Sequence, residues 1–175
     1  MRPEASSTGG EAMPPPGEFR IRPLLVEEAP AAAALIRAAF AVQPVRPDPP
    51  PSALRETADG VRKQLASGGG MAVEVAGTLV GVLLWTPNED GLWLARLAVA
   101  PEWRRRGIAR ALLAAAEAEA RRKGLGHLRL GTRLVLERNR RLFASCGFRE
   151  TALHTHPGYA APTWVTMEKR LDAEG

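Results

Sequence analysis

Four arginines surround one glycine in the stretch PEWRRRGIAR, residues 101–110. An apolar run, LWLARLAVA, precedes this stretch and an alanine-rich run, ALLAAAEAEA, follows it. The N-terminus of a helix presents unpaired backbone N–H groups and the positive end of the helix dipole, which together bind anions. Glycine at such a point lets a bulky ligand approach the backbone closely. The stretch therefore predicts a phosphate-binding loop, and the competing interpretation is a solvated run of surface charge.

The positive net charge of the chain limits the expected ligands to anionic ones. A formal net charge of +5 favours nucleic acid, an anionic membrane surface or a phosphorylated small molecule as partner. No run approaches the roughly 20 apolar residues that span a bilayer, so we expect no membrane-spanning segment. No helix-turn-helix or RNA-binding motif supports a nucleic-acid binder. We therefore expect a phosphorylated small molecule, and nucleic acid stays as the weaker alternative.

The length of 175 residues suits one domain with tails. The first residues, MRPEASSTGGEAMPPPG, lack the apolar segment of a signal peptide and are rich in Gly, Pro and Ser. They predict a disordered N-terminal tail over residues 1–17, followed by one domain over residues 18–171. The lack of a signal peptide and the single cysteine, Cys146, predict a cytoplasmic protein. We expect Cys146 to be a small core residue rather than a nucleophile.

Apolar periodicity and turn residues predict the order of the elements. We expect strands at residues 19–22, 71–77, 78–85, 92–100, 127–133, 148–154 and 163–171. We expect helices at residues 27–40, from an N-cap at Ser52 to Leu65, at 107–123 and at 139–146, and turns at 67–70 and 86–91. The three strands over 71–100 predict an antiparallel meander, and the strand, helix and strand over 92–133 predict a parallel pair. The sequence therefore predicts the α+β class, with a mixed, mostly antiparallel central sheet flanked by helices.

The residues from 104 to 109 spell R-x-x-G-x-A between a strand and an amphipathic helix. This pattern resembles the pyrophosphate loop of the GNAT superfamily of acyl-CoA-dependent N-acetyltransferases, Q/R-x-x-G-x-G/A. Its flanks, LAVAPEWRRRGIARALL, and the later segment NRRLFASCGF also resemble the family, and the resemblance covers residues 18–171. It implies the GNAT fold and an enzyme that transfers an acetyl group from acetyl-CoA to a primary amine of a small molecule or protein, by direct attack in a ternary complex.

The resemblance also implies which residues bind acetyl-CoA. Strand backbone would contact the pantetheine arm, N–H groups and arginine side chains of the loop would hold the pyrophosphate, and the later helix would add further contacts. The implied set is Leu97, Ala98, Val99, Arg104, Arg105, Arg106, Gly107, Ile108, Ala109, Asn139 and Phe143. Asn139 opens the predicted helix at 139–146, so helix capping is its equally strong alternative role.

The catalytic groups depart from the family pattern. Phe143 stands where the family often has a tyrosine that protonates the departing thiolate, so the proton would come from water or from Tyr159. Trp93 and its apolar neighbours stand where many members have a glutamate base. His154 or His156 could act as the base through water, and the alternative is that both are surface residues beside a loop. We predict no metal site, because no further ligands accompany their H-x-H spacing.

The acceptor amine has no motif of its own. We expect its pocket between the proline-rich residues 42–51, the second helix and the loop at 154–162. Acidic residues there, Asp48, Glu56 and Asp59, would attract a cationic amine or simply belong to a solvated helix face. Trp93 and Trp164 would line this pocket or belong to the core.

Two further alternatives concern the whole protein. The missing tyrosine and glutamate leave open a non-catalytic protein of the same fold that binds or senses acyl-CoA. Family members are often dimers, so a homodimer is one expectation for the oligomeric state.

Overall fold

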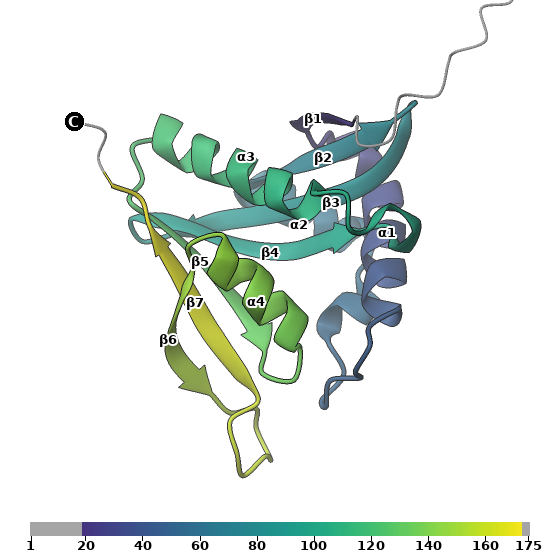
Figure 1. Ribbon diagram of the computed structural model, residues 1–175. Helices are drawn as coiled ribbons and strands as arrows, with labels where there is room; N and C mark the ends of the chain where they lie inside the picture. Colours follow the sequence, from purple (N-terminus) through teal and green to yellow (C-terminus); the bar gives the residue numbers. More distant parts are fainter. Residues whose placement is uncertain (1–18, 173–175) are drawn as a thin grey trace, which may run out of the picture.

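The computed structural model describes residues 19–172, so the tail predicted over residues 1–17 lies outside the described part. A single sheet of seven strands runs through the molecule in the order β1-β2-β3-β4-β5-β7-β6 (Figure 1). The strands are β1 (Arg20–Pro23), β2 (Gly69–Val75), β3 (Thr78–Asn88), β4 (Gly91–Val99), β5 (His127–Arg133), β6 (Arg149–His154) and β7 (Trp164–Arg170). The α-helices are α1 (Ala29–Ala41), α2 (Ala58–Ser67), α3 (Ile108–Arg122) and α4 (Glu137–Ser145).

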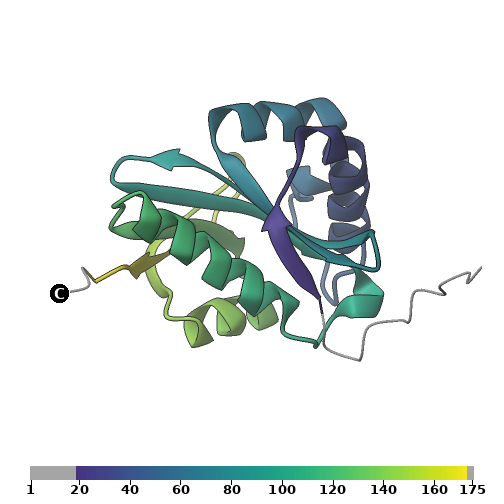
Figure 2. The same ribbon diagram turned by 90° about the horizontal axis from the view of Figure 1, so that it is seen from above.

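The predicted topology is confirmed. Strands β1 to β4 form an antiparallel meander, α3 connects the parallel pair β4 and β5, and β7 lies between β5 and β6. Helices α1 and α2 cover one face of the sheet and α3 and α4 cover the other (Figure 2). None of the helices within residues 19–172 is long and apolar enough to cross a membrane.

Two buried clusters hold the layers together. The larger joins α3 and α4 to the sheet and includes Leu112, Leu128 and Met167. The smaller joins α1 and α2 to the opposite face and is built largely from alanines of α1. Leu128 and Leu130 of β5 face α3 and α4, so the alternating residues Arg129, Gly131 and Arg133 lie on the other face. That face of β5 lies on the side where we expected the acceptor pocket.

Several predicted boundaries were wrong. Strand β2 begins at Gly69, inside the predicted turn at 67–70, because Gly69 and Gly70 pair with β3. Helix α2 begins after Thr57, whose hydroxyl accepts a hydrogen bond from Gly60 N–H, whereas Ser52 opens a separate 3-10 turn, η2 (Ser52–Arg55). Strand β3 continues to Asn88, because its residues 84–88 pair with β4, so the predicted turn at 86–91 shortens to Glu89 and Asp90. Helix α4 begins at Glu137, two residues before Asn139.

Candidate active site

The predicted phosphate-binding loop leads into the N-terminus of α3. A short 3-10 turn, η3 (Pro101–Trp103), follows β4, and the chain then passes through Arg105 and Gly107 at positive φ, 64° and 80°. Gly107 is the N-cap residue of α3, and no atom lies within 4 Å of the position that a Cβ would occupy. The loop therefore leaves open space directly above the helix end.

Backbone N–H groups are available at this helix end. The first backbone hydrogen bond of α3 runs from Ala111 N–H to Gly107 O. The N–H groups of Ile108, Ala109 and Arg110 have no backbone partner within residues 19–172. Ile108 anchors the helix, because Gly81 of β3 has no side chain and its Cβ would lie 2.9 Å from the Ile108 side chain. The first turn of α3 is thus fixed against the sheet, and its unpaired N–H groups and positive dipole end favour an anion at this point.

The three arginines of the loop have different partners. Arg104 donates from Nη1 to Val42 O and from Nη2 to Ala39 O, both at 2.9 Å, and so binds the last carbonyls of α1. The Arg106 guanidinium lies 4.4 Å from the centre of the Trp103 ring, a cation–π contact. Arg105 is exposed and makes no hydrogen bond within the described residues. Within the described part of the chain, Arg105 and Arg106 therefore keep all their donors available to a phosphate, and of the two only Arg106 is held in place by an aromatic ring.

Strands β4 and β5 separate beside this loop. Their parallel pairing runs from Gly91 and His127 to Leu94 and Leu130 and stops there. On β4 a bulge follows, with Arg96 at a φ of 59°, and Ala98 and Val99 then pair only with β3. Within the described residues no strand pairs with the other edge of β4 beyond Leu94. Residues Leu97, Ala98 and Val99, predicted to contact pantetheine, lie on this open edge.

A buried ion pair holds the bulge to the acceptor-side loop. The Glu56 carboxylate, in a residue only 7% exposed, accepts hydrogen bonds from Arg96 Nε at 2.9 Å and Gln64 Nε2 at 3.0 Å. Arg96 Nη2 also donates to Ser52 Oγ, and Arg37 Nη1 donates to the backbone oxygen of Glu56. Glu56 is therefore neutralised by Arg96 and does not lie free to attract an amine.

Helix α4 contributes apolar packing at the positions that the sequence singled out. Phe143 is 7% exposed and packs edge-to-face on Phe148, with ring centres 6.0 Å apart. Asn139 lies in the first turn of α4, and the N-cap position is Leu136, which makes no side-chain cap hydrogen bond. Asn139 therefore does not cap this helix.

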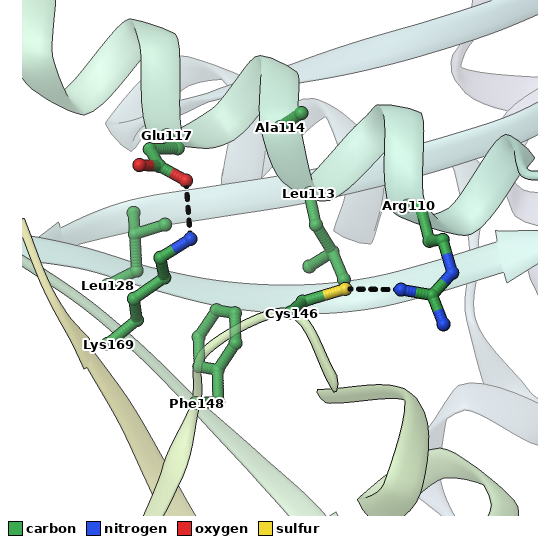
Figure 3. A pocket seen from close by; sticks show the side chains of 8 residues that line it. All are labelled: Arg110, Leu113, Ala114, Glu117, Leu128, Cys146, Phe148 and Lys169. Carbon is green, nitrogen blue, oxygen red and sulfur yellow. Dashed lines mark hydrogen bonds and ion pairs between the residues drawn. The ribbon is translucent and has the colours of Figure 1, made fainter. Parts of the chain in front are cut away.

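A cavity of about 190 Å³ lies between α3, strands β5 and β7, and the residues 146–148 that follow α4 (Figure 3). Arg110 Nη1 donates to Cys146 Sγ at 3.6 Å on one side, and Lys169 Nζ donates to Glu117 Oε2 at 2.7 Å on the other. Cys146 is half-buried and packs against the larger apolar cluster. Its surroundings are those of a packing residue.

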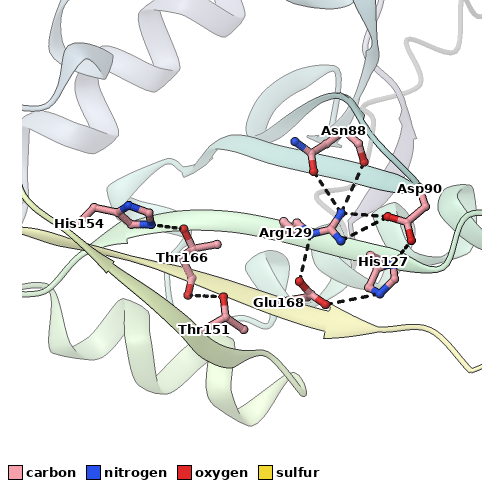
Figure 4. Close-up of polar contacts among 8 residues, drawn as sticks. All are labelled: Asn88, Asp90, His127, Arg129, Thr151, His154, Thr166 and Glu168. Atoms are coloured by element: carbon pink, nitrogen blue, oxygen red, sulfur yellow. Dashed lines mark hydrogen bonds and ion pairs between the residues drawn. The ribbon is translucent and has the colours of Figure 1, made fainter.

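The acceptor face of the sheet carries an aromatic wall. Trp93 and Trp164 flank Gly131, where a Cβ would lie 3.0 Å from the Trp164 ring and 3.4 Å from the Trp93 ring. His154 stacks on Trp164 with ring centres 3.8 Å apart, and its Nε2 lies 2.7 Å from Thr166 Oγ1 (Figure 4). The absence of a side chain at Gly131 lets the two indole rings pack closely against the backbone of β5.

His156 and Tyr159 lie in the loop between β6 and β7. The Tyr159 hydroxyl donates to Asp48 Oδ1 at 2.6 Å, so it connects this loop to the proline-rich residues 42–51. That hydrogen bond raises the pKa of Tyr159, so the phenol stays protonated. His156 Nδ1 contacts Thr163 Oγ1, and loss of hydration together with the charge of Arg133 lowers the pKa of His156. His156 is therefore neutral at pH 7.

The structure brings together most of the predicted acceptor-side residues, and it adds Arg133 and Arg96. Arg133 Nη1 donates to Pro49 O at 2.6 Å, and burial lowers the pKa of Arg133. The alternation HLRLGTR places Arg133 on the polar face of β5, a signal that sequence reasoning could have used. The sequence around Arg96 gave no comparable signal, because the contacts of Arg96 depend on the bulge in β4 and on the distant Glu56.

No group of three or more His, Cys, Asp or Glu side chains within residues 19–172 is placed to hold a metal ion. His154 and His156 are instead engaged by threonine hydroxyls, as described above. The groups that the structure offers for chemistry are the unpaired N–H groups at the start of α3 and the histidine, tyrosine and arginine side chains beside β6 and β7.

Comparisons with known proteins agree with this geometry. The model of the acetyltransferase (GNAT) family matches residues 33–148. The chain therefore belongs to the GNAT family of acyl-CoA-dependent N-acetyltransferases, as the resemblance of the loop predicted. No curated protein matches it by sequence.

Solved structures share the fold. The ribosomal-protein-S18-alanine N-acetyltransferase from Escherichia coli aligns with a TM-score of 0.73 at 21% identity, over 90% of this chain and 97% of that one. The paia N-acetyltransferase from Thermoplasma acidophilum, in complex with coenzyme A, aligns with a TM-score of 0.70 at 16% identity, over 88% and 99%. A structure of yncA from Salmonella typhimurium with acetyl-CoA aligns with a TM-score of 0.67 at 20% identity, over 89% and 95%.

Proposed function

We propose that this protein transfers an acetyl group from acetyl-CoA to a primary amine by direct attack in a ternary complex. The observation that carries the proposal is the open N-terminus of α3, capped by Gly107 at positive φ, beside the point where β4 and β5 separate. The unpaired N–H groups, Arg105 and Arg106 suit a pyrophosphate, because charge-assisted hydrogen bonds are roughly twice as strong as neutral ones. The gap beyond Leu94 suits an extended pantetheine arm, and family members in complex with coenzyme A share the fold.

In the proposed reaction, acetyl-CoA supplies the thioester. The amine nitrogen forms a bond to the carbonyl carbon, the carbon–sulfur bond breaks, the nitrogen loses a proton and the thiolate gains one. Backbone N–H groups near Ala98 or Val99 would stabilise the developing oxyanion. The ion pair of Glu56 and Arg96 supports this role, because it fixes the bulge that sets the path of β4.

His156 is the proposed base, acting through water. Its lowered pKa keeps the imidazole neutral at pH 7 and able to accept a proton. His154 is less suited to this role, because its ring stacks directly on Trp164 with ring centres 3.8 Å apart, whereas the rings of His156 and Trp164 are 6.5 Å apart. We assign His154 to the wall of the acceptor site.

Water is the proposed source of the proton for the thiolate. Phe143 has no acidic group and is buried. The Tyr159 hydroxyl donates its proton to Asp48 Oδ1 at 2.6 Å, so this proton is directed to Asp48 and not to the thiolate. Tyr159 instead supports the acceptor site by holding Asp48.

Thermal unfolding with and without acetyl-CoA tests the cofactor site. At a ligand concentration near 100 times Kd the stabilisation is about 2.7 kcal/mol, or about 5–11 °C for a chain of this size. Gly107→Glu should abolish the shift, because it adds bulk and negative charge at the anion site. Gly77→Glu is the matched control, since Gly77 has a φ of 79° and equally open surroundings at the turn between β2 and β3. No shift in the wild-type protein at millimolar acetyl-CoA would contradict the proposal.

Release of free thiol tests catalysis separately. An acetyltransferase releases thiol from acetyl-CoA only when a suitable amine is present. Binding of acetyl-CoA without thiol release for any primary amine would favour the alternative function, a non-catalytic protein that binds or senses acyl-CoA, for which the apolar, buried Phe143 is the supporting observation.

A further inference from the structure

Arg133 differs from the other half-buried arginines. Residues 19–172 contain five of them, and four are paired with carboxylates: Arg22, Arg96, Arg129 and Arg140. Arg133 has no carboxylate within salt-bridge distance in this part of the chain, and its one hydrogen bond goes to the uncharged Pro49 O. A half-buried guanidinium without a counter-ion is costly, and in a chain that pairs its other buried charges it indicates a binding role.

The position of Arg133 in the sheet indicates from which side a ligand would reach it. Arg133 pairs in register with Trp164 of β7, and Trp164 pairs with His154 of β6, so the three side chains form one row across the acceptor face. The row lies past Leu130, where β5 has already parted from β4. Arg133 is therefore next to the opening through which an amine would reach the thioester.

The surroundings of Arg133 leave it donors for an anion. A guanidinium has five N–H donors, and one of them is used on Pro49 O. The nearest opposing charge is Asp48, which is exposed and already accepts the Tyr159 hydroxyl. Burial also lowers the pKa of Arg133, because the buried guanidinium has lost hydration and, in the described part of the chain, no carboxylate within salt-bridge distance compensates for that loss.

We propose that Arg133 binds a carboxylate on the acceptor, so that the acceptor is a small molecule with both a primary amine and a carboxylate. This inference rests on the proposed function and specifies its substrate class. A planar guanidinium binds a carboxylate through two parallel hydrogen bonds, which fixes the orientation of the molecule as well as its affinity. The remainder of the acceptor would lie against the indole rings of Trp93 and Trp164, which pack on Gly131 beside this row.

Binding of matched products tests the proposal without depending on turnover. Isothermal titration in the presence of coenzyme A would compare N-acetyl amino acids with the corresponding N-acetyl amino amides, over a set in which the amine and carboxylate are one to three carbons apart. The acids should bind about 10- to 100-fold more tightly than the amides, the range expected for hydrogen bonds to a charged group. Equal affinity, or no binding of any acid at 10 mM, would overturn the proposal.

Three variants would test whether Arg133 is responsible for the preference for acids over amides. Arg133→Gln should remove the preference for acids, Arg133→Lys should keep part of it, and Asp48→Asn should increase it because a competing carboxylate is lost. The matched control is Arg129→Gln, on the same face of β5, whose guanidinium is already bound by Glu168, Asp90 and Asn88 (Figure 4). An unchanged preference in Arg133→Gln, or an equal loss in Arg129→Gln, would assign the effect elsewhere and overturn the proposal.

The acetyl-CoA thermal shift separates the two levels of inference. A normal acetyl-CoA shift with no preference for acids would reject the role of Arg133 and leave the proposed function intact. The absence of an acetyl-CoA shift would reject the proposed function itself.

Discussion

At the scale of single residues, His156 is the side chain whose charge state should control the rate. Its imidazole accepts a proton only when neutral, so kcat/KM should fall as the pH falls through its pKa. Burial and the charge of Arg133 place that pKa below its usual value near 6.5. The rate profile should therefore break below pH 6.5 and be flat from there to neutrality.

Two variants check this assignment by pH–rate measurement. His156→Gln should lose the break, because no other group replaces the imidazole. Arg133→Gln should move the break to higher pH, because it removes a positive charge that opposes protonation. A break that stays in place in both variants would remove His156 as the base.

The second residue-scale prediction concerns Tyr159. If water protonates the thiolate, Tyr159→Phe should slow turnover less than about threefold, whereas loss of a general acid typically costs 10²- to 10⁴-fold. The KM of the acceptor should rise, because the hydrogen bond to Asp48 that joins the two loops is lost. Steady-state kinetics with an amine that is turned over separates the two parameters. Turnover slowed by about two orders of magnitude or more would make Tyr159 the acid.

At the scale of elements, the loop after β4 is tied to α1 by one arginine. Arg104→Gln should lower the free energy of unfolding by about 1–2 kcal/mol, because Arg104 binds two carbonyls at the end of α1. It should change the Kd of acetyl-CoA by less than about threefold. Arg105→Gln is the matched variant and should do the opposite, weakening acetyl-CoA about tenfold with little change in stability. Thermal unfolding and titration measure both effects, and equal weakening of acetyl-CoA by both variants would mean that Arg104 also reaches the pyrophosphate.

The element order followed from the sequence, whereas element ends did not always do so. The switch from alternating to helical periodicity around residue 107 located α3 to within one residue. Ser52 and Thr57 are both good N-cap types, and only packing decided between them, because the intervening Glu56 is held by Arg96. The 86–91 segment has turn composition, yet pairing with β4 extends β3 through most of it.

At the scale of the whole molecule, we expect the net charge of +5 to favour binding of a small anion, acetyl-CoA, and not of a nucleic acid. A protein that contacts 6–10 phosphates loses about 10³- to 10⁵-fold in affinity between 50 and 200 mM salt. Acetyl-CoA makes fewer charged contacts, held partly by backbone, so its Kd should weaken less than about tenfold over that range. Titration of acetyl-CoA and of a DNA duplex at both salt concentrations checks this, and tight duplex binding at 200 mM would contradict it.

The homodimer, the cytoplasmic location and the domain limits at residues 18 and 171 stay predictions.

The sequence by itself determined the family, the topology and the position of the loop before α3, because these depend on residues that are close along the chain. The pattern from Arg104 to Ala109 is contiguous, and the apolar residues of the strand before it and of the helix after it recur at regular spacings. Only the tertiary structure decided what the side chains of the acceptor side do. Arg133 meets Pro49 across 84 residues and Tyr159 meets Asp48 across 111. Such contacts depend on sheet register and on how distant loops meet. Local patterns therefore do not encode that, within residues 19–172, Arg129 is paired with carboxylates whereas Arg133 on the same strand is not.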